Sequence, residues 1–175
     1  MKKYIAFLRA INVGGTKIIK MDNLKKIFES FGFANVQTYI QSGNVVFETK
    51  ESAMLEAKIE EQLEQALGYK VEVFLRTMDE LAKIASQPAF EPRGDETLHV
   101  VFLRKSQDAN HKSKQELLSF RSEADDFAVK GREVYNLRRD RDKSVFSNNF
   151  IEKSLKESNT TRNLTTLRKI TEKYG

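Results

Sequence analysis

Residues suited to binding chemistry cluster near the amino terminus, in the stretch FLRAINVGGTKIIKMDNL at positions 7–24. Between an apolar run and an amphipathic pattern stand an arginine, an asparagine, two glycines and two lysines: Arg9, Asn12, Gly14, Gly15, Lys17 and Lys20. Glycine lets backbone N–H groups approach a ligand closely, and the first N–H groups of a helix lie at its positive end without helical partners. The stretch therefore predicts a place where the backbone approaches an anion.

This stretch matches neither of the common nucleotide-binding loops. It is not G-x-x-x-x-G-K-[ST], and its two glycines are adjacent, so the spacing of G-x-G-x-x-G is absent as well. A simple turn flanked by solvated lysines explains the residue types equally well. Both interpretations stay open at this point.

Alternating strands and helices account for the first half of the chain. Apolar runs, alternation and apolar spacings of three and four predict strand 3–9, helix 21–31, strand 35–41, strand 44–48, helix 55–67 and strand 70–76. This order is that of the split βαβ, or ferredoxin-like, fold. Ser52 is the candidate cap of the second helix, and Thr77 with Glu80 forms a capping box that opens a third helix.

The second half begins after residues 87–96, which contain both prolines and a glycine and mark the expected junction. We expect an α+β protein with two subdomains, a ferredoxin-like βαββαβ(α) subdomain over 1–88 and a smaller α+β subdomain over 89–175 that ends in two helices. Within the latter, a strand covers 97–104 and a hairpin turns at Lys130-Gly131. The element pattern partly repeats that of the first half, but no residue-level repeat is visible.

The predicted topology brings two distant segments together. In a βαββαβ sheet the first two strands run parallel, with the third antiparallel between them. The loop over 9–20 and the turn Gln41-Ser42-Gly43-Asn44 should then converge at one edge, beside the start of the first helix. For the second segment alone, a plain hairpin turn is the alternative.

Other candidates for chemistry are sparse. His99 and His111 are far apart in sequence, and a strand histidine is more often a packing residue than a base. The paired aspartates, Asp125-Asp126 and Asp140 with Asp142, have no histidine at ligand spacing, so we expect neither a metal nor a cofactor. No serine lies in G-x-S-x-G. The basic run RRDRDK over 138–143 fits a solvated loop better than a nucleic-acid patch.

Composition sets the broad class. The net charge is +5, from 30 lysines and arginines against 25 acidic residues, and no cysteine is present to form a disulfide. The apolar run at the start ends at Arg9 without a cleavage site, and no stretch of about 18 apolar residues follows. We therefore expect a cytoplasmic protein without a membrane partner, and the charge is compatible with nucleic acid or another anion. The sequence does not indicate an oligomeric state.

Three segments, RAINVGG, KMDNLKKIFESFGFANVQTYIQSGNVVF and TTRNLTTLRKI, together resemble a bacterial family, the domain of unknown function 1697. The resemblance implies an α+β fold with two subdomains and no established activity. The matching motif positions are Arg9, Asn12, Gly14, Gly15, Ser42, Gly43, Asn44, Thr161, Arg162 and Asn163. The family usually has tryptophan after the last of these, where this chain has Leu164.

The carboxy-terminal motif, TTRN at residues 160–163, can also be interpreted from its residues alone. Thr160 or Thr161 would cap the last helix, which places Arg162 and Asn163 in its first turn. An arginine there opposes the helix dipole unless a carboxylate or a ligand lies nearby. Arg162 and Asn163 are therefore candidates for the same site, and an ion pair between the subdomains is the equal alternative.

The leading hypothesis is binding of an anionic ligand, a phosphate-containing small molecule or a nucleic acid, at the edge formed by loops 9–20 and 41–44. The arginine and the two lysines would supply charge, the glycines N–H donors, and Asn12 and Asn44 orienting hydrogen bonds. One alternative is an enzyme that acts on a phosphorylated small molecule in the same cleft. The other is a non-catalytic protein-interaction module, in which Arg9 and Arg162 are paired with protein acids.

Overall fold

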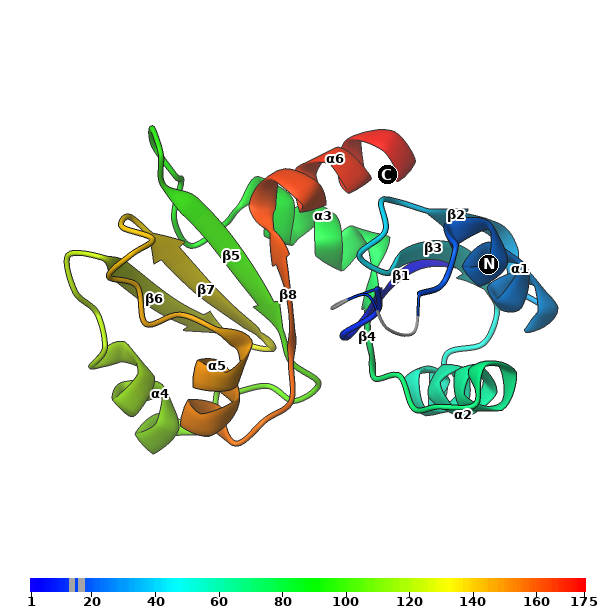
Figure 1. The fold of residues 1–175 in the computed structure, drawn as a ribbon, viewed down its shortest axis with the longest axis horizontal. Helices are drawn as coiled ribbons and strands as arrows, with labels where there is room; N and C mark the ends of the chain where they lie inside the picture. The colour runs from blue at the N-terminus through cyan, green and yellow to red at the C-terminus, as the bar shows by residue number, and fades with distance from the viewer. Residues whose placement is uncertain (13–14, 16–17) are drawn as a thin grey trace. The chain divides into compact units, whose positions relative to one another are not determined.

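The computed structural model of the chain describes residues 1–12, 15 and 18–175. In these residues it contains six helices and two four-stranded antiparallel sheets, an α+β architecture (Figure 1). They form two compact units, one of Met1–Ala82 with Lys173–Gly175 and one of Lys83–Glu172. Within the described ranges, no helix is both long and apolar enough to cross a membrane.

The first unit has a sheet in which β1 is a central strand. In chain order its elements are β1 (Lys2–Leu8), α1 (Met21–Ser30), β2 (Ala34–Thr38), β3 (Asn44–Thr49), α2 (Leu55–Leu67) and β4 (Val73–Thr77). The strands lie in the order β2-β3-β1-β4, and each neighbouring pair is antiparallel. Helix α3 (Met78–Ser86) begins at the residue after β4.

Helices α1 and α2 cover one face of this sheet. The period of their apolar residues places Phe28 of α1 and Ile59 of α2 in the core against Ala6 and Phe47, and all four side chains are fully buried. The ring of Phe33 stacks on that of Phe47 with 4.4 Å between centroids. This core holds β1 in place and so fixes the point at which the strand ends.

The last residues of the chain complete the first unit. The Nζ of Lys3 donates to the carbonyl oxygen of Tyr174 at 2.9 Å, and the hydroxyl of Tyr174 donates to the carbonyl oxygen of Thr38 at 3.2 Å. These bonds join β1 and β2 to a segment about as distant in sequence as the chain allows.

The second unit repeats the element order of the first. Its elements are β5 (Thr97–Phe102), α4 (His111–Leu118), β6 (Asp125–Lys130), β7 (Glu133–Arg138), α5 (Asn148–Leu155), β8 (Thr160–Asn163) and α6 (Leu164–Tyr174), whose last two residues belong to the first unit. The strand order β6-β7-β5-β8 is the equivalent of β2-β3-β1-β4, and all pairs are again antiparallel. Helices α4 and α5 contact one another and bury Leu117 and Ile151 against the sheet (Figure 1).

The strand registers extend this repeat to single residues. Ile5 of β1 is opposite Arg76, and Val100 of β5 is opposite Arg162, one residue before the end of β4 and of β8. Counting from these pairs aligns Phe7-Leu8-Arg9 with Phe102-Leu103-Arg104. The sequence without the register did not reveal this correspondence, because the segments between the matching strands differ.

Two predicted helix starts are wrong. Residues Thr160–Asn163 form strand β8, so Arg162 and Asn163 do not lie in the first turn of a helix, and neither Thr160 nor Thr161 caps one. Asn163 takes the capping role, because its Oδ1 accepts the N–H of Thr165 at 2.9 Å. A strand of four residues is too short to show an alternation pattern. Ser52 does not cap α2, whose N-cap residue is Met54 without a side-chain hydrogen bond.

Two other local predictions are confirmed. The N–H of Thr77 donates to Glu80 Oε2 at 2.7 Å, and the N–H of Glu80 donates to Thr77 Oγ1 at 3.1 Å, which is a capping box at the start of α3. The hairpin of β6 and β7 turns at Lys130-Gly131, where Gly131 has a φ of 56°.

The two caps give a matched pair of stability predictions. We expect Thr77→Ala and Asn163→Ala each to lower the free energy of unfolding by about 1 kcal/mol, because each leaves a helix N–H group without its side-chain acceptor. Ser52→Ala is the control and should leave stability unchanged. Urea unfolding of the three variants measures the effects, and equal losses in all three would contradict the assignment of the caps.

Candidate functional site

The loop after β1 and the turn between β2 and β3 lie together at one end of the sheet. The N–H of Leu8 donates to the carbonyl oxygen of Gly43 at 2.8 Å, and Asn12 Nδ2 donates to the carbonyl oxygen of Gln41 at 3.0 Å. The strand order predicted this convergence. We call the described residues of 9–20 and residues 41–44 the first edge; Gly14 and Lys17, both predicted site residues, lie outside the described part of the chain.

Gly43 allows the two segments to approach each other closely. Its φ is 80°, and a Cβ at this position would lie 2.7 Å from Cγ2 of Ile11 and 3.0 Å from Cβ of Leu8. Only glycine combines this backbone conformation with so little space. The glycine of the turn therefore serves the contact between loop and turn directly.

Two motif asparagines hold the same segments by their side chains. Asn12 accepts the N–H of Ile19 at 2.6 Å through Oδ1, and its Nδ2 donates to the carbonyl oxygens of Ile19 and Gln41 at 3.0 Å. Asn44 is fully buried, and its Nδ2 donates to the carbonyl oxygen of Tyr39 and to Ser42 Oγ. These carboxamides bond to the protein itself, so their role is to shape the loops.

Left-handed backbone is concentrated at this edge. Ala10, Asn12 and Ile40 have φ values of 56°, 56° and 48°, and Gly15 and Gly43 have 72° and 80°. A β-branched residue rarely adopts such a conformation, which costs about 1–2 kcal/mol. Ile40 adopts this conformation, and its side chain is 52% exposed. The hydrogen bonds of the asparagines and the packing of Gly43 stabilise these strained residues.

Arg9 is engaged by a protein carboxylate. Its Nη1 lies 3.2 Å from Oε1 of Glu72, and its backbone N–H donates to the carbonyl oxygen of Glu72 at 2.9 Å. The side chains are 23% and 40% exposed, so the pair lies at the surface, where such pairs contribute little to stability. Arg9 is therefore not a cation held solely for a ligand.

The start of α1 offers donors at the first edge. Lys20 occupies the N-cap position and is exposed, and no side chain among the described residues caps the helix. The first N–H groups of α1 are thus available to an acceptor. Asp22 lies exposed in the first turn, where its negative charge is favourable to the helix and competes with an incoming anion.

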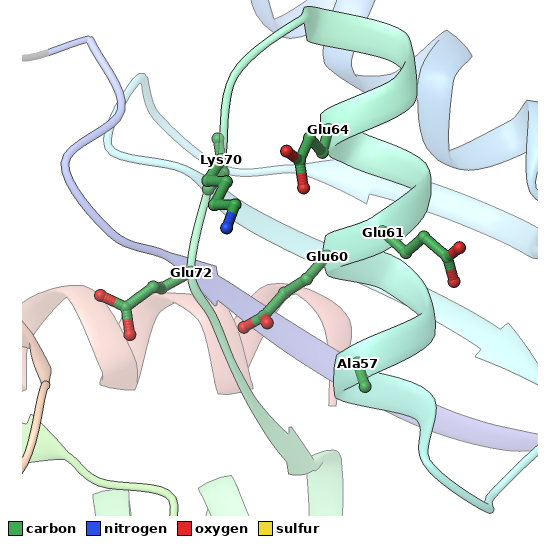
Figure 2. A pocket seen from close by; sticks show the side chains of 7 residues that line it. Ala57, Glu60, Glu61, Glu64, Lys70 and Glu72 are labelled. Carbon is green, nitrogen blue, oxygen red and sulfur yellow. The ribbon is translucent and has the colours of Figure 1, made fainter.

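A pocket of about 270 Å³ lies near this edge, between α2 and the segment that leads to β4. In Figure 2, Lys70 extends toward Glu60 and Glu64 of α2, while Glu61 and the carboxylate of Glu72 point away from it. The carboxylates of Glu60 and Glu64 outnumber the single ammonium group there, and that of Glu72 is paired with Arg9, so the lining is acidic. It is therefore unsuited to the anionic ligand that the sequence predicts, and an anion would have to bind at the loops instead.

The two carboxy-terminal site candidates lie in the second unit. Arg162 is only 8% exposed, and its Nη1 donates to Thr160 Oγ1 at 2.8 Å and to the carbonyl oxygen of Thr161 at 2.9 Å. Burial lowers the pKa of its guanidinium to about 10. Asn163 is exposed and caps α6.

Arg76 is the equivalent of Arg162 in the first unit, and the sequence analysis did not select it. It is 1% exposed, and its Nη1 donates to the carbonyl oxygen of the preceding residue, Leu75, at 2.8 Å. Arg162 bonds to its own preceding carbonyl in the same way. The only available signal was a single arginine inside an apolar strand, which is insufficient without the register.

A polar network around His99 also escaped the sequence analysis. His99 Nδ1 lies 3.1 Å from Oδ1 of Asn136, whose Nδ2 donates to Oδ1 of the buried Asp125 at 2.9 Å. Asp125 also accepts the hydroxyl of Ser144 and the N–H of Val145. The amide oxygen of Asn136 can only accept, so Nδ1 of His99 carries a proton. Burial lowers the pKa of His99, while the bond to Asn136 acts in the opposite sense.

Fold and edge together define an α+β protein built from two sheets of the same strand order, with a loop and a turn joined by hydrogen bonds at the end of the first sheet. The sequence model of the family described as "Protein of unknown function (DUF1697)" matches residues 1–135, and the chain belongs to this family. The matched range includes the first edge and ends before Thr161–Asn163.

One solved structure, described as "The structure of conserved bacterial protein SP0830 from Streptococcus pneumoniae", is similar to this chain over nearly its whole length. The TM-score is 0.71 at 20% identity, and the alignment covers 98% of this chain and 97% of the other. At this identity the likeness concerns the fold alone. No curated protein matches the chain.

The contact at Gly43 predicts a specific loss of stability. We expect Gly43→Ala to lower the free energy of unfolding by about 2 kcal/mol or more, because the new Cβ adds overlap with Ile11 to the cost of a left-handed alanine. Gly15→Ala is the matched control: its φ is also positive, but no atom lies within 4 Å of the new Cβ.

A double-mutant cycle isolates the overlap. Ile11→Ala removes the contacting Cγ2, so Gly43→Ala should cost less in that background than in the native chain. Strict additivity of the two substitutions in urea unfolding would contradict the proposed contact.

The His99 network predicts a pH-dependent stability. Because the pKa of His99 is lower in the folded than in the unfolded chain, the unfolded state binds more protons below about pH 6.5. The free energy of unfolding should therefore fall as the pH falls through that value. His99→Gln should flatten this dependence, and His111→Gln, at an exposed position, should retain it. Thermal unfolding between about pH 5 and 8 measures it, and an unchanged profile for His99→Gln would refute the assignment.

Proposed function

We propose that the first edge binds an anionic, phosphate-containing ligand. The single observation that carries the proposal is the start of α1, which has no side-chain cap among the described residues and lies beside exposed Lys20. Backbone N–H groups at a helix start, together with the helix dipole, favour a phosphoryl group. Residues 9–20 and 41–44 contain no acidic residue that would repel it.

The motif residues divide into two roles in this proposal. Asn12, Gly43 and Asn44 shape the loops, because their side chains or backbone bond to the protein. Lys20 and the first N–H groups of α1 contact the ligand, and Lys17 adds charge. Arg9 forms an ion pair with Glu72 at 3.2 Å and so holds this carboxylate away from the ligand.

We infer further that the first unit has the ferredoxin-like arrangement. Support comes from its order of elements, strand–helix–strand–strand–helix–strand, and from the strand order β2-β3-β1-β4. In this arrangement the loop after β1 and the turn between β2 and β3 lie at the same end of the sheet. The fold thus supplies the geometry that the ligand site requires.

A protein-interaction module is the second candidate function. Ile18 is 68% exposed and Ile40 is 52% exposed, and both lie in the segments that Asn12 joins. If the two side chains form one apolar patch, that patch would be a contact surface for a partner protein.

Substitutions at helix starts test the anion proposal. Lys20→Gln should weaken binding of inorganic phosphate and pyrophosphate by about two- to fivefold, and Asp22→Asn should strengthen it by a similar factor, because it removes a competing charge from the uncapped start. Titration followed by backbone amide NMR measures both affinities and should show shifts at residues 20–23.

The control is Asp79→Asn in the first turn of α3. It makes the same change of charge on an exposed side chain, but the capping box already occupies that helix start. It should leave phosphate binding unchanged. Equal effects of Asp22→Asn and Asp79→Asn, or no shifts at residues 20–23, would refute the anion site and favour the interaction module.

A further inference from the structure

The internal repeat places an equivalent edge in the second unit. The N–H of Leu103 donates to the carbonyl oxygen of Arg132 at 2.9 Å, which is the counterpart of the bond that joins loop and turn in the first unit. We call residues 103–114 and 130–133 the second edge. It comprises the loop after β5, the start of α4 and the turn between β6 and β7.

The loop of the second edge is also held in a fixed shape. The N–H of Gln107 donates to the carbonyl oxygen of Gly131 at 2.8 Å, and its Oε1 accepts Nδ2 of Asn110 at 2.9 Å. Gln107 is 2% exposed. The segment therefore presents its neighbouring side chains from a defined position.

Positive charge is concentrated at the second edge. Residues 104–114 and 130–133 hold six lysines and arginines against two acidic residues, an excess of four in a chain whose net charge is +5. The basic side chains are Arg104, Lys105, Lys112, Lys114, Lys130 and Arg132. The loop, the turn and the helix start of this edge thus carry a local excess of positive charge.

The lysines of this edge are accessible. Lys105, Lys112 and Lys130 are exposed, and none of them forms an ion pair in the part of the chain that the structure describes. Lys130 lies 6.0 Å from the ring centroid of Tyr135. The first turn of α4 contains no acidic residue. These three ammonium groups are therefore available to the negative groups of a ligand.

The composition of the second edge also bears on whether it could distinguish one base sequence from another. It contains no phenylalanine, tyrosine or tryptophan, and His111 is its single ring on which a base could stack. Lysine contacts to phosphates supply affinity without sequence information. A repeated phosphate fits several dispersed lysines better than a single phosphate does.

We propose that the second edge binds the phosphodiester backbone of a nucleic acid without preference for base sequence. The proposal is independent of the ligand at the first edge, since it rests on different residues in the other unit. RNA and DNA share the chemistry it requires.

Fluorescence anisotropy with labelled single-stranded RNA and labelled duplex DNA tests the proposal on the full chain. Binding should weaken steeply with added salt and be similar for different base sequences. Lys105→Gln with Lys130→Gln should weaken binding by about tenfold or more and reduce the salt slope by about two. The nucleic acid that binds more tightly, RNA or DNA, is the one that the second edge prefers.

Two controls make the result specific. Lys2→Gln with Lys50→Gln makes the same change in net charge at exposed lysines of the first unit and should leave binding nearly unchanged. Lys105→Arg with Lys130→Arg keeps the charge and should retain binding. Absence of binding at low salt, a strong dependence on base sequence, or equal losses in the two glutamine pairs would overturn the proposal. Lys20→Gln should not affect it.

Discussion

The close contact between Gly43 and Ile11 is the constraint on which the first edge depends. A Cβ added at residue 43 would lie only 2.7 Å from Cγ2 of Ile11, so the turn can approach the loop this closely only with glycine there. The hydrogen bonds of Asn12 and the strained backbone at Ile40 become tolerable because this contact fixes the geometry around them. The described residues of this motif thus serve first to pack the loop against the turn.

Local signals in the sequence were enough for some local structure but not for all of it, since the expected caps at Ser52 and Thr160 or Thr161 are absent. The capping box of Thr77 and Glu80 and the turn at Lys130-Gly131 each depend on a few neighbouring residues, and both were predictable. Strand β8 was not, because its four residues are defined by pairing with β5 across a long separation in sequence. The same holds for the candidate site: convergence of its two segments followed from strand order, but the pairing of Arg9 with Glu72 did not.

The repeat connects residues that had no common explanation. Arg76 and Arg162 occupy the same register position, are both buried, and bond to the preceding carbonyl oxygen in the same way. Their burial is therefore a property of the repeated unit. The two edges, in contrast, differ in composition. The first edge has glycines and asparagines in a loop and turn with left-handed backbone, and the second edge has lysines and arginines. The same order of strands and helices therefore carries two edges with different side chains.

The position of Lys173–Gly175 in the first unit has a consequence for how the protein is made. Synthesis proceeds from the amino terminus, so residues 1–82 emerge before any residue of the second unit. The bonds from Tyr174 to β1 and β2 can form only after residues 83–172 have been translated. The second unit is therefore inserted, in the order of synthesis, between the body of the first unit and its closing segment. The unit that starts folding earliest is the one whose last contacts form latest.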